Sequence, residues 1–278
     1  MIIIDRETRG RHGNKIFHFN TLMQLSNLLG QEAFCDSWHG YNSFEQTCSL
    51  LKKKVQAREI PFKDIIYNSH EELRKKYSHG DWKLHTLSLC GPFFNLSKKD
   101  PREFIKLKNP AVLTLPEGHA AVGIHIRGGD TRGADGMNCK EIHPPEYYKN
   151  AIDYVLEWFK GKVAFYLCTD DPDMNFPSYR DTLLHLMHKN AMLYHNKTNN
   201  YMEDFAILAE CDVLISGSST FALAAGMTGK HKKIIHSKDF VEQFKNEDQK
   251  WYSSFGNGMF FHHMNHMKSD YYNVWRLL

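Results

Sequence analysis

Short apolar runs alternate with amphipathic segments through the second half of the chain. β-branched runs predict buried strands, and apolar residues at helical spacing between them predict helices. The predicted strands cover residues 121–126, 163–168, 191–194, 213–215 and 233–236, and the predicted helices cover about 146–160, 179–189, 201–209 and 221–227. This alternation is typical of an α/β domain built on a parallel sheet.

The first half of the chain begins with the same pattern and then becomes less regular. Residues 2–4 predict a strand. A polar turn at 8–14 follows it, and then a helix from about Lys15 to Leu29. Strand, glycine turn and helix are the opening of a nucleotide-binding α/β unit, although the turn does not match G-x-G-x-x-G. The later expectations are a strand at 33–35, helices at 44–58 and 69–77, a strand at 87–94, a helix start at 100–101 and a linker at 109–118.

These elements predict two domains and a tail. Residues 1–115 form a first Rossmann-like domain, residues 116–245 form a second one, and residues 246–278, which are rich in aromatic residues and histidine, form helical segments that pack back on the body. The length of 278 residues fits this division.

Composition and charge narrow the class of protein. With 42% apolar residues, 24% charged residues and a net charge of +3, the chain is an ordinary globular protein with no basic excess for nucleic acid or membranes. No signal-peptide core follows Met1, and no apolar run is long enough to span a bilayer. Six widely spaced cysteines without a C-x-x-C pair suit a reducing, cytoplasmic compartment, with Cys168 and Cys211 as buried thiols. A Golgi-lumenal domain without its anchor is the alternative.

The stretch from Ala121 to Asp130 reads A-V-G-I-H-I-R-G-G-D and organises the rest. Its apolar run predicts a strand buried on both faces, and ligands of open α/β sheets bind outside the carboxyl ends of such strands. There the guanidinium of Arg127 can grip a phosphate, and the Gly128–Gly129 step lets a ligand approach the backbone. The competing interpretation is a surface turn in which Arg127 pairs with Asp130.

Two further polar groups lie beside predicted helix starts. The turn Ser216–Thr220 precedes a helix, whose amino end and hydroxyl groups form an anion site. Ordinary N-capping explains the same residues. Asp204 opens another helix, where a carboxylate can accept the paired N–H donors of a guanine edge, or can be a solvated acidic first turn.

The remaining acidic groups point to a base more than to a metal. Asp135 follows Arg127 on a loop and is a candidate general base, although loop acids are commonly just solvated. Asp171–Pro172–Asp173 matches the D-x-D that holds a divalent metal in some glycosyltransferases, but Asp-Pro is also ordinary turn chemistry. We expect no metal site.

Four motifs, taken together, resemble the α-1,2-fucosyltransferases and the wider group of GDP-fucose-dependent enzymes with an H-x-R-R-x-D-type motif, to which the α-1,6-fucosyltransferases are related. They are G-R-H-G-N at 10–14, V-G-I-H-I-R-G-G-D at 122–130, F-Y-L-C-T-D-D at 165–171, and E-D-F-A-I-L-A-E-C at 203–211 with S-S-T-F at 218–221. The resemblance implies a GT-B fold, in which two Rossmann-like domains face each other across a cleft, with inversion at the transferred sugar and no obligatory metal or cofactor.

The resemblance also implies roles for individual residues. Arg127 would hold the β-phosphate of GDP, and His125 and Asp204 would face the guanine. Asp135 stands where the α-1,6 enzymes carry a proposed base. The other implied donor contacts are Ser218, Ser219 and Thr220 in the second domain, and the segment 10–14, which includes His12, Gly13 and Asn14, in the first.

One position departs from the family pattern. Gly128 stands where the family has a second Arg, so one positive charge expected at the donor is missing. Either His12 or Arg132 compensates, or the transferred sugar differs.

The sequence thus predicts an inverting glycosyltransferase that transfers fucose from GDP-fucose to a hydroxyl of a glycan acceptor. An enzyme that uses another nucleotide sugar, such as UDP-xylose, and a non-catalytic nucleotide- or glycan-binding module are the alternatives.

Overall fold

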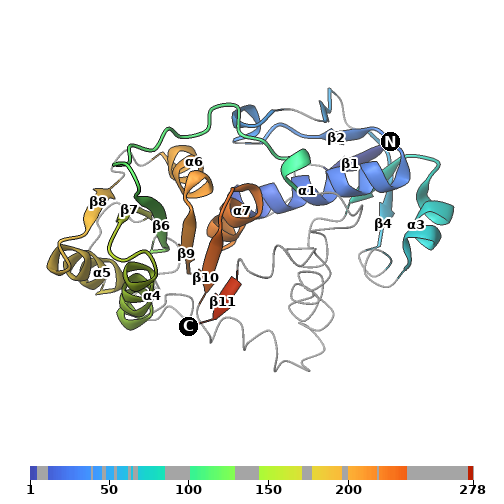
Figure 1. The fold of residues 1–278 in the computed structure, drawn as a ribbon. Coiled ribbons are helices and arrows are strands. Elements are labelled where there is room, and N and C mark those ends of the chain that lie inside the picture. The colour runs from blue at the N-terminus through green and yellow to red at the C-terminus, as the bar shows by residue number, and fades with distance from the viewer. Residues whose placement is uncertain are drawn as a thin grey trace. The chain divides into compact units, whose positions relative to one another are not determined.

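The structure, a computed structural model, describes residues 1–4, 12–38, 40–45, 48–52, 55–61, 64, 68–84, 101–128, 144–170, 177–195, 200–217, 219–236 and 275–277. The chain divides into two compact units (Figure 1). The described part of the first unit falls within Met1–Lys108, and that of the second within Asn109–Glu242 and Asp270–Leu278. The division lies at the start of the segment predicted as a linker.

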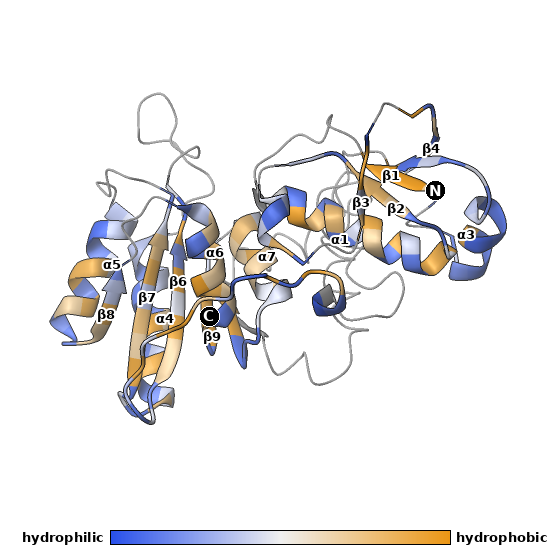
Figure 2. Cartoon of the chain, turned by 90° about the horizontal axis from the view of Figure 1, so that it is seen from above, coloured by the Kyte–Doolittle hydropathy of each residue, from blue (hydrophilic) through white to orange (hydrophobic). Residues whose placement is uncertain are grey.

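The first unit is built on a parallel sheet with the strand order β3-β2-β1-β5-β4. β1 lies in the middle, and its three isoleucines are buried. In Figure 2, β1 is coloured hydrophobic and α3 is largely hydrophilic. The elements are β1 (Ile2–Ile4), α1 (His12–Leu29), β2 (Ala33–Cys35), η1 (Tyr41–Ser43), β3 (Ser49–Leu50), β4 (Arg58–Ile60), α3 (His70–Tyr77), β5 (Trp82–Leu84) and η3 (Pro101–Glu103).

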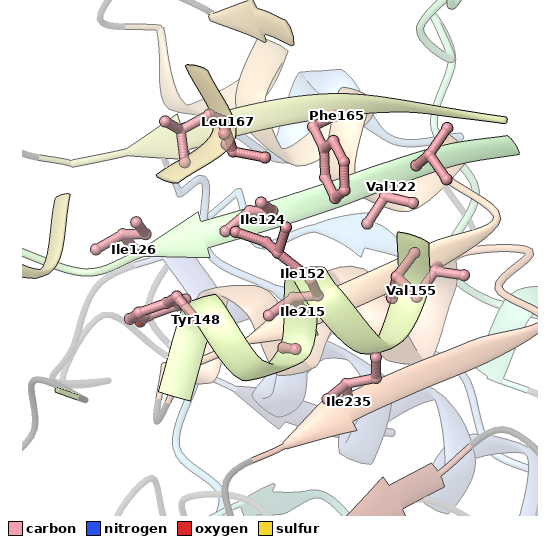
Figure 3. Packing of buried hydrophobic residues seen from close by; sticks show 14 of the residues in the cluster. Val122, Ile124, Ile126, Tyr148, Ile152, Val155, Phe165, Leu167, Ile215 and Ile235 are labelled. Carbon is pink, nitrogen blue, oxygen red and sulfur yellow. The ribbon is translucent and has the colours of Figure 1, made fainter. Parts of the chain in front are cut away.

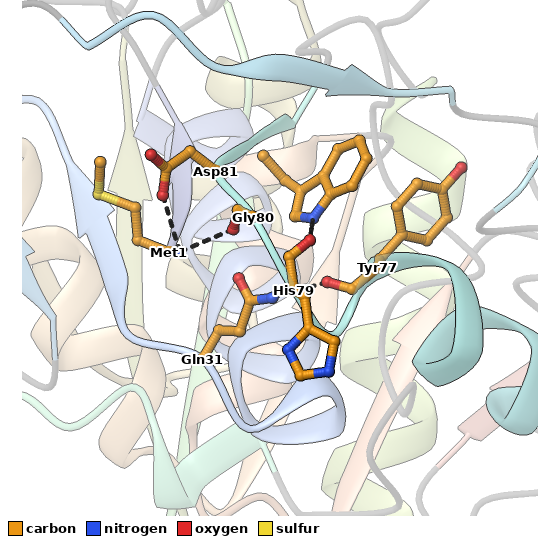
Figure 4. Close-up of polar contacts among 7 residues, drawn as sticks. Met1, Gln31, Tyr77, His79, Gly80 and Asp81 are labelled. Carbon is orange, nitrogen blue, oxygen red and sulfur yellow. Dashed lines mark hydrogen bonds and ion pairs between the residues drawn. The ribbon is translucent and has the colours of Figure 1, made fainter.

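Polar contacts fix the amino end of the chain to the segment between α3 and β5. The amino group of Met1 donates to the carbonyl oxygen of Gly80 at 3.0 Å and lies 3.2 Å from the carboxylate of Asp81 (Figure 4). Gln31, after α1, donates to the carbonyl oxygen of Tyr77 at 2.7 Å. These bonds tie α1, α3 and the central strand together, because each one joins residues far apart along the chain.

α3 begins as the sequence predicts. Ser69 and Glu72 form a reciprocal capping box, in which each side chain accepts a hydrogen bond from the backbone N–H of the other residue. This arrangement satisfies two N–H groups that the first helical turn leaves without partners.

The predicted helix at 44–58 is wrong. Phe44 forms an isolated antiparallel bridge with Leu107, and β3 and the start of β4 occupy part of the same segment. Apolar residues in this segment fit a helical spacing, but parallel pairing of β3 with β2 instead lets the N–H of Leu51 donate to the carbonyl oxygen of Cys35. The predicted strand at 87–94 lies outside the described residues.

The second unit is a doubly wound sheet with the strand order β11-β10-β9-β6-β7-β8, and all its described pairings are parallel. From β8 to β11 this is the order 3-2-1-4-5-6 of dinucleotide-binding folds. The elements are β6 (Ala120–Ile126), α4 (Pro145–Trp158), β7 (Val163–Thr169), α5 (Pro177–His188), β8 (Met192–His195), α6 (Tyr201–Glu210), β9 (Val213–Ser216), α7 (Thr220–Thr228), β10 (Lys233–His236) and β11 (Trp275–Leu277).

All seven residues of β6 are buried, as the sequence predicts for a central strand. Val122, Ile124 and Ile126 point to one face of the sheet, where they pack with Ile152 and Val155 of α4 (Figure 3). Alternate residues of a strand point to opposite faces. Gly123 therefore faces the other side, where a Cβ would lie 3.0 Å from a methyl of Leu208 in α6. α4 and α6 cover the two faces of the strand.

The sequence predicts helical segments for the carboxyl-terminal tail, and this prediction is wrong for residues 275–277. They form β11, which pairs in parallel with β10. Pairing at the edge of the sheet gives the backbone of these residues hydrogen-bond partners that the local pattern does not reveal. The rest of the tail, residues 246–274 and residue 278, lies outside the described residues.

Gly229, which ends α7, has φ of −82°, so backbone strain does not explain the glycine. Its surroundings do, because a Cβ would lie 2.5 Å from the carbonyl oxygen of Ala209 and 2.8 Å from that of Ala225. We expect Gly229→Ala to lower the free energy of unfolding by about 3 kcal/mol, since backbone must move. Gly161→Ala is the comparison, because Gly161 has φ of +77° but open space around the position of a Cβ. This variant should lower the free energy of unfolding by about 1 kcal/mol. Urea unfolding of both variants measures this, and an equal loss would contradict the steric explanation.

Candidate functional site

The site lies at the carboxyl ends of β6 and β9. After β6 the chain winds through α4, β7, α5 and β8 on one side, and α6 then carries it back to β9 on the other side of β6. The connections therefore reverse direction between β6 and β9. In open α/β sheets the crevice outside such a switch point is where ligands bind.

Three polar or sulfur side chains form a row across this end of the sheet. The parallel register aligns His125 of β6 with Ser216 of β9 and with Cys168 of β7. The row faces α6 and α7, because it lies on the same face as Gly123. The His125 ring centroid is 5.3 Å from that of Phe221 in α7, and Phe221 in turn packs edge-on against Phe205 of α6.

His125 is a neutral imidazole at physiological pH. The side chain is buried, and burial lowers its pKa to about 4, against the raising effect of the nearby Asp170 charge and with a smaller lowering effect from Arg127. Its Nδ1 has no hydrogen-bond partner among the described residues. A buried ring nitrogen without a partner is costly, so this atom is suited to contact a ligand at the switch point.

Asp204 lies beside this row. It belongs to the first turn of α6, is 7% exposed, and forms a hydrogen bond with the Cys168 side chain. Burial, followed by the Asp204 charge, raises the pKa of Cys168 well above its ordinary value, so Cys168 stays a thiol. The interpretation of Asp204 as a solvated acidic turn is therefore wrong. That description fits its exposed neighbour Glu203, which accepts from the N-cap residue Asn200 at 2.9 Å.

A hydrogen bond joins the segments that leave β6 and β7. The backbone N–H of Gly128 donates to the carboxylate of Asp170 at 2.6 Å. Arg127, which is partly buried, directly precedes this bond, so its backbone is fixed at the carboxyl edge of the sheet. Asp130, the partner of Arg127 in the competing interpretation, lies outside the described residues.

α7 presents its amino end at the same edge. Only Gly217, residue 218 and Ser219 separate β9 from Thr220, the first residue of α7. The Ser219 hydroxyl accepts from the Phe221 N–H at 3.3 Å, so Ser219 is an N-cap, as one of the two interpretations holds. A capping hydroxyl can still donate its own proton to an anion, and the helix dipole favours negative charge there. Thr220 is partly buried, and Ser218 lies outside the described residues.

The segment of the first unit with proposed donor contacts has a different local structure from the predicted turn. His12, Gly13 and Asn14 are the first residues of α1, so the prediction of a turn at these positions is wrong. Gly13 is buried, and the side chains of His12 and Asn14 are not among the described features.

Several candidate residues lie outside the described residues: Asp135, Asp171 and Asp173. Within the described part of the chain, His, Cys, Asp and Glu side chains form no group of three or more that could hold a metal ion. No described helix is both long enough and apolar enough to cross a membrane.

Sequence reasoning missed two members of the site. The sequence predicts Cys168 only as a buried thiol, and names Asp170 only within the family motif at 165–171. The available signal was their place at the end of the strand that follows the organising strand. Parallel neighbours put their carboxyl ends at one edge of a sheet, but register and face come only from the structure.

The buried neutral His125 predicts a loss of stability in mild acid. The unfolded chain binds a proton near pH 6.5, whereas the folded site resists protonation down to about pH 4. The contribution of His125 to the free energy of unfolding should therefore be constant above pH 6.5 and fall between pH 6.5 and 4, by about 3 kcal/mol. Burial also lowers the pKa of His231 to about 4, so His231 adds a loss of stability over the same pH range. Urea unfolding at a series of pH values should show a shallower loss for His125→Gln, and an unchanged pH dependence would refute this assignment.

No protein-family model matches the chain, and no curated protein matches its sequence. Solved structures do match. The α-1,6-fucosyltransferase NodZ, co-crystallised with GDP, is similar with a TM-score of 0.50 and 14% identity over 86% of this chain and 95% of NodZ. POFUT1 in complex with GDP-fucose is similar with a TM-score of 0.53 and 11% identity over 83% of this chain and 95% of POFUT1. The chain thus has the GT-B fold of these fucosyltransferases, which confirms the predicted fold class.

Proposed function

We propose that this protein is an inverting glycosyltransferase that transfers fucose from GDP-fucose to a hydroxyl of a glycan acceptor. The observation that carries the proposal is the set of groups at the switch point. A buried carboxylate and a neutral imidazole lie on one side of the carboxyl edge, and a helix amino end follows the neighbouring strand there. The solved structures with the same fold that hold GDP or GDP-fucose support the choice of donor.

The nucleobase contacts follow from the chemistry of Asp204 and His125. A carboxylate presents two acceptor oxygens, which match the ring N–H and the exocyclic amine of guanine. Uracil has no such pair of adjacent donors. The neutral His125 can donate from one ring nitrogen and accept at the other, so it suits a base edge better than a phosphate.

The diphosphate contacts follow from positive charge. Arg127 supplies a guanidinium, and the amino end of α7, with Ser218, Ser219 and Thr220, supplies N–H and hydroxyl donors. When the sugar leaves, negative charge grows on the departing diphosphate. Donors fixed in place before the reaction stabilise that charge by several kcal/mol. This arrangement requires no metal, which agrees with the resemblance to metal-independent enzymes.

The transfer step needs a base and an acceptor. In the proposed step, Asp135 takes the proton of the acceptor hydroxyl, whose oxygen attacks the anomeric carbon on the side opposite the diphosphate, and the configuration inverts. Asp135 and the donor contacts of His12, Gly13 and Asn14 remain predictions. The cytoplasmic compartment is likewise a prediction.

Gly128 gives the alternatives a specific basis. Its N–H is used by Asp170, and it brings no charge to the donor where the family pattern has Arg. Another nucleotide sugar, such as UDP-xylose, or a binding module without turnover is consistent with that loss of charge. Binding of GDP without transfer to any acceptor in a broad glycan panel would favour the binding module, and a preference for UDP would favour the other donor.

Asp204→Asn should reduce discrimination between bases. An amide offers one acceptor and places a donor opposite a guanine donor, so we expect the affinity for GDP to fall by about tenfold or more, with little change for UDP. Calorimetric titration with both nucleotides measures this. The matched control is Glu203→Gln, which changes the exposed carboxylate at the preceding position and should leave the affinity for both nucleotides as in wild type. Equal losses for GDP and UDP would argue against a guanine contact.

Arg127→Ala should weaken binding of the diphosphate and spare the nucleoside. We expect a loss of about 10- to 100-fold for GDP and little change for guanosine, because a charged hydrogen bond to phosphate is removed. Arg127→Lys should restore part of the loss, since it keeps charge without the planar fork. Lys162→Ala, next to the amino end of β7, is the control. A variant that binds GDP as tightly as wild type would exclude Arg127 from the phosphate site.

A further inference from the structure

Two cysteines of the first unit lie in contact. Cys35 is the last residue of β2 and is 1% exposed, and Cys48 is partly buried directly before β3. Their Sγ atoms are 3.2 Å apart, and both are free thiols. They play no part in the proposed transfer reaction.

The backbone around each cysteine is held by its own hydrogen bonds. β2 and β3 pair in parallel, with Cys35 aligned with Leu50. The carbonyl oxygen of Cys35 accepts from the N–H of Leu51 at 2.9 Å, and that of Cys48 accepts from the Tyr41 hydroxyl at 2.9 Å. The thiols are therefore brought together by the sheet and by a buried tyrosine. A bond between them needs the sulfur atoms to approach by only about 1 Å.

We propose that Cys35 and Cys48 form a reversible intramolecular disulfide in exchange with a small-molecule disulfide such as oxidised glutathione. The bond staples the carboxyl end of β2 to the start of β3 and closes the segment between them. The described residues offer no third metal ligand beside the pair, so they give no basis for a metal site here.

The two thiols have different parts in the exchange. Cys48 is the more exposed, and its pKa is lowered, chiefly by the hydrogen bond with Cys35 and further by Tyr41, against the effect of burial. That hydrogen bond raises the pKa of Cys35, with burial adding to it. Cys48 is thus the thiolate that reacts first, and Cys35 is the resolving thiol.

The exchange is balanced in two steps. The Cys48 thiolate attacks one sulfur of glutathione disulfide, whose S–S bond breaks, and one glutathione leaves as a thiolate and takes up a proton. Cys35 then gives up its proton and attacks the Cys48 sulfur of the mixed disulfide, and the second glutathione leaves. The two protein thiols are oxidised by two electrons, and the glutathione disulfide is reduced to two thiols.

The test uses the full chain, incubated in mixtures of reduced and oxidised glutathione and then trapped with N-ethylmaleimide. N-ethylmaleimide labels only free thiols. Peptide mass spectrometry should show that Cys35 and Cys48 escape this label together and are cross-linked to each other in oxidised samples, and dithiothreitol should restore labelling of both. The melting temperature of the oxidised protein should be roughly 5–10 °C higher, because the closed loop restricts the unfolded chain.

Single variants separate the two roles. Cys35→Ser should keep glutathione bound to Cys48, because nothing resolves the mixed disulfide, and Cys48→Ser should leave the buried Cys35 reduced. Cys211→Ser, a buried thiol elsewhere, is the control and should not change the exchange. Melting of the reduced variants checks that each is folded. The proposal would be overturned if N-ethylmaleimide still labels both Cys35 and Cys48 in folded wild type after incubation with oxidised glutathione. A disulfide between Cys35 and a different cysteine would overturn it as well.

Discussion

The parallel pairing of β6 with both β7 and β9 is the constraint on which the candidate site depends. β6 is buried on both faces, so its position in the sheet is strongly specified. Its register with two neighbours aligns Ser216, His125 and Cys168 in one row. A shift by one residue would turn the row to the face covered by α4, because alternate residues point to opposite faces. Packing of the apolar residues of β6 therefore decides where the polar ones lie.

The electrostatics of the site follow from burial. His125 is kept neutral by its burial, which lowers its pKa although the carboxylate of Asp170 acts in the opposite direction. Asp204 is buried beside a thiol that stays protonated and can donate to it. The site therefore separates the acceptor carboxylate of Asp204 and the neutral imidazole of His125, which suit a base, from the positive charge of Arg127 and the dipole of α7, which suit phosphates. That separation is what a nucleotide with a polar base and an anionic tail requires.

Close helix packing supports this arrangement. α6 reaches the sheet over Gly123, where a larger residue would meet Leu208 and Cys211, and it carries Asp204 at its start. α7 is held near α6 through Gly229, whose lack of a side chain lets two backbone carbonyls come close. Glycines in the core thus set the distance between the helices and the row of polar side chains. Their contribution to the site is steric and does not depend on unusual backbone angles at these two positions.

The sequence by itself determined the parts with strong local signals. The apolar run of β6, the alternation of strands and helices after it and the helix at 69–77 could be predicted from periodicity, because neighbouring residues encode it. The GT-B class was implied by the resemblance of four motifs to a known family. The first unit was less predictable, since strands of two or three residues, such as β3 and β4, carry too little pattern to exclude a helix. The tertiary structure alone decided that Cys168 meets Asp204, that Cys35 meets Cys48, and that the end of the chain supplies β11. These contacts arise from pairing and crossover between distant segments, and no local preference of the residues involved encodes their register.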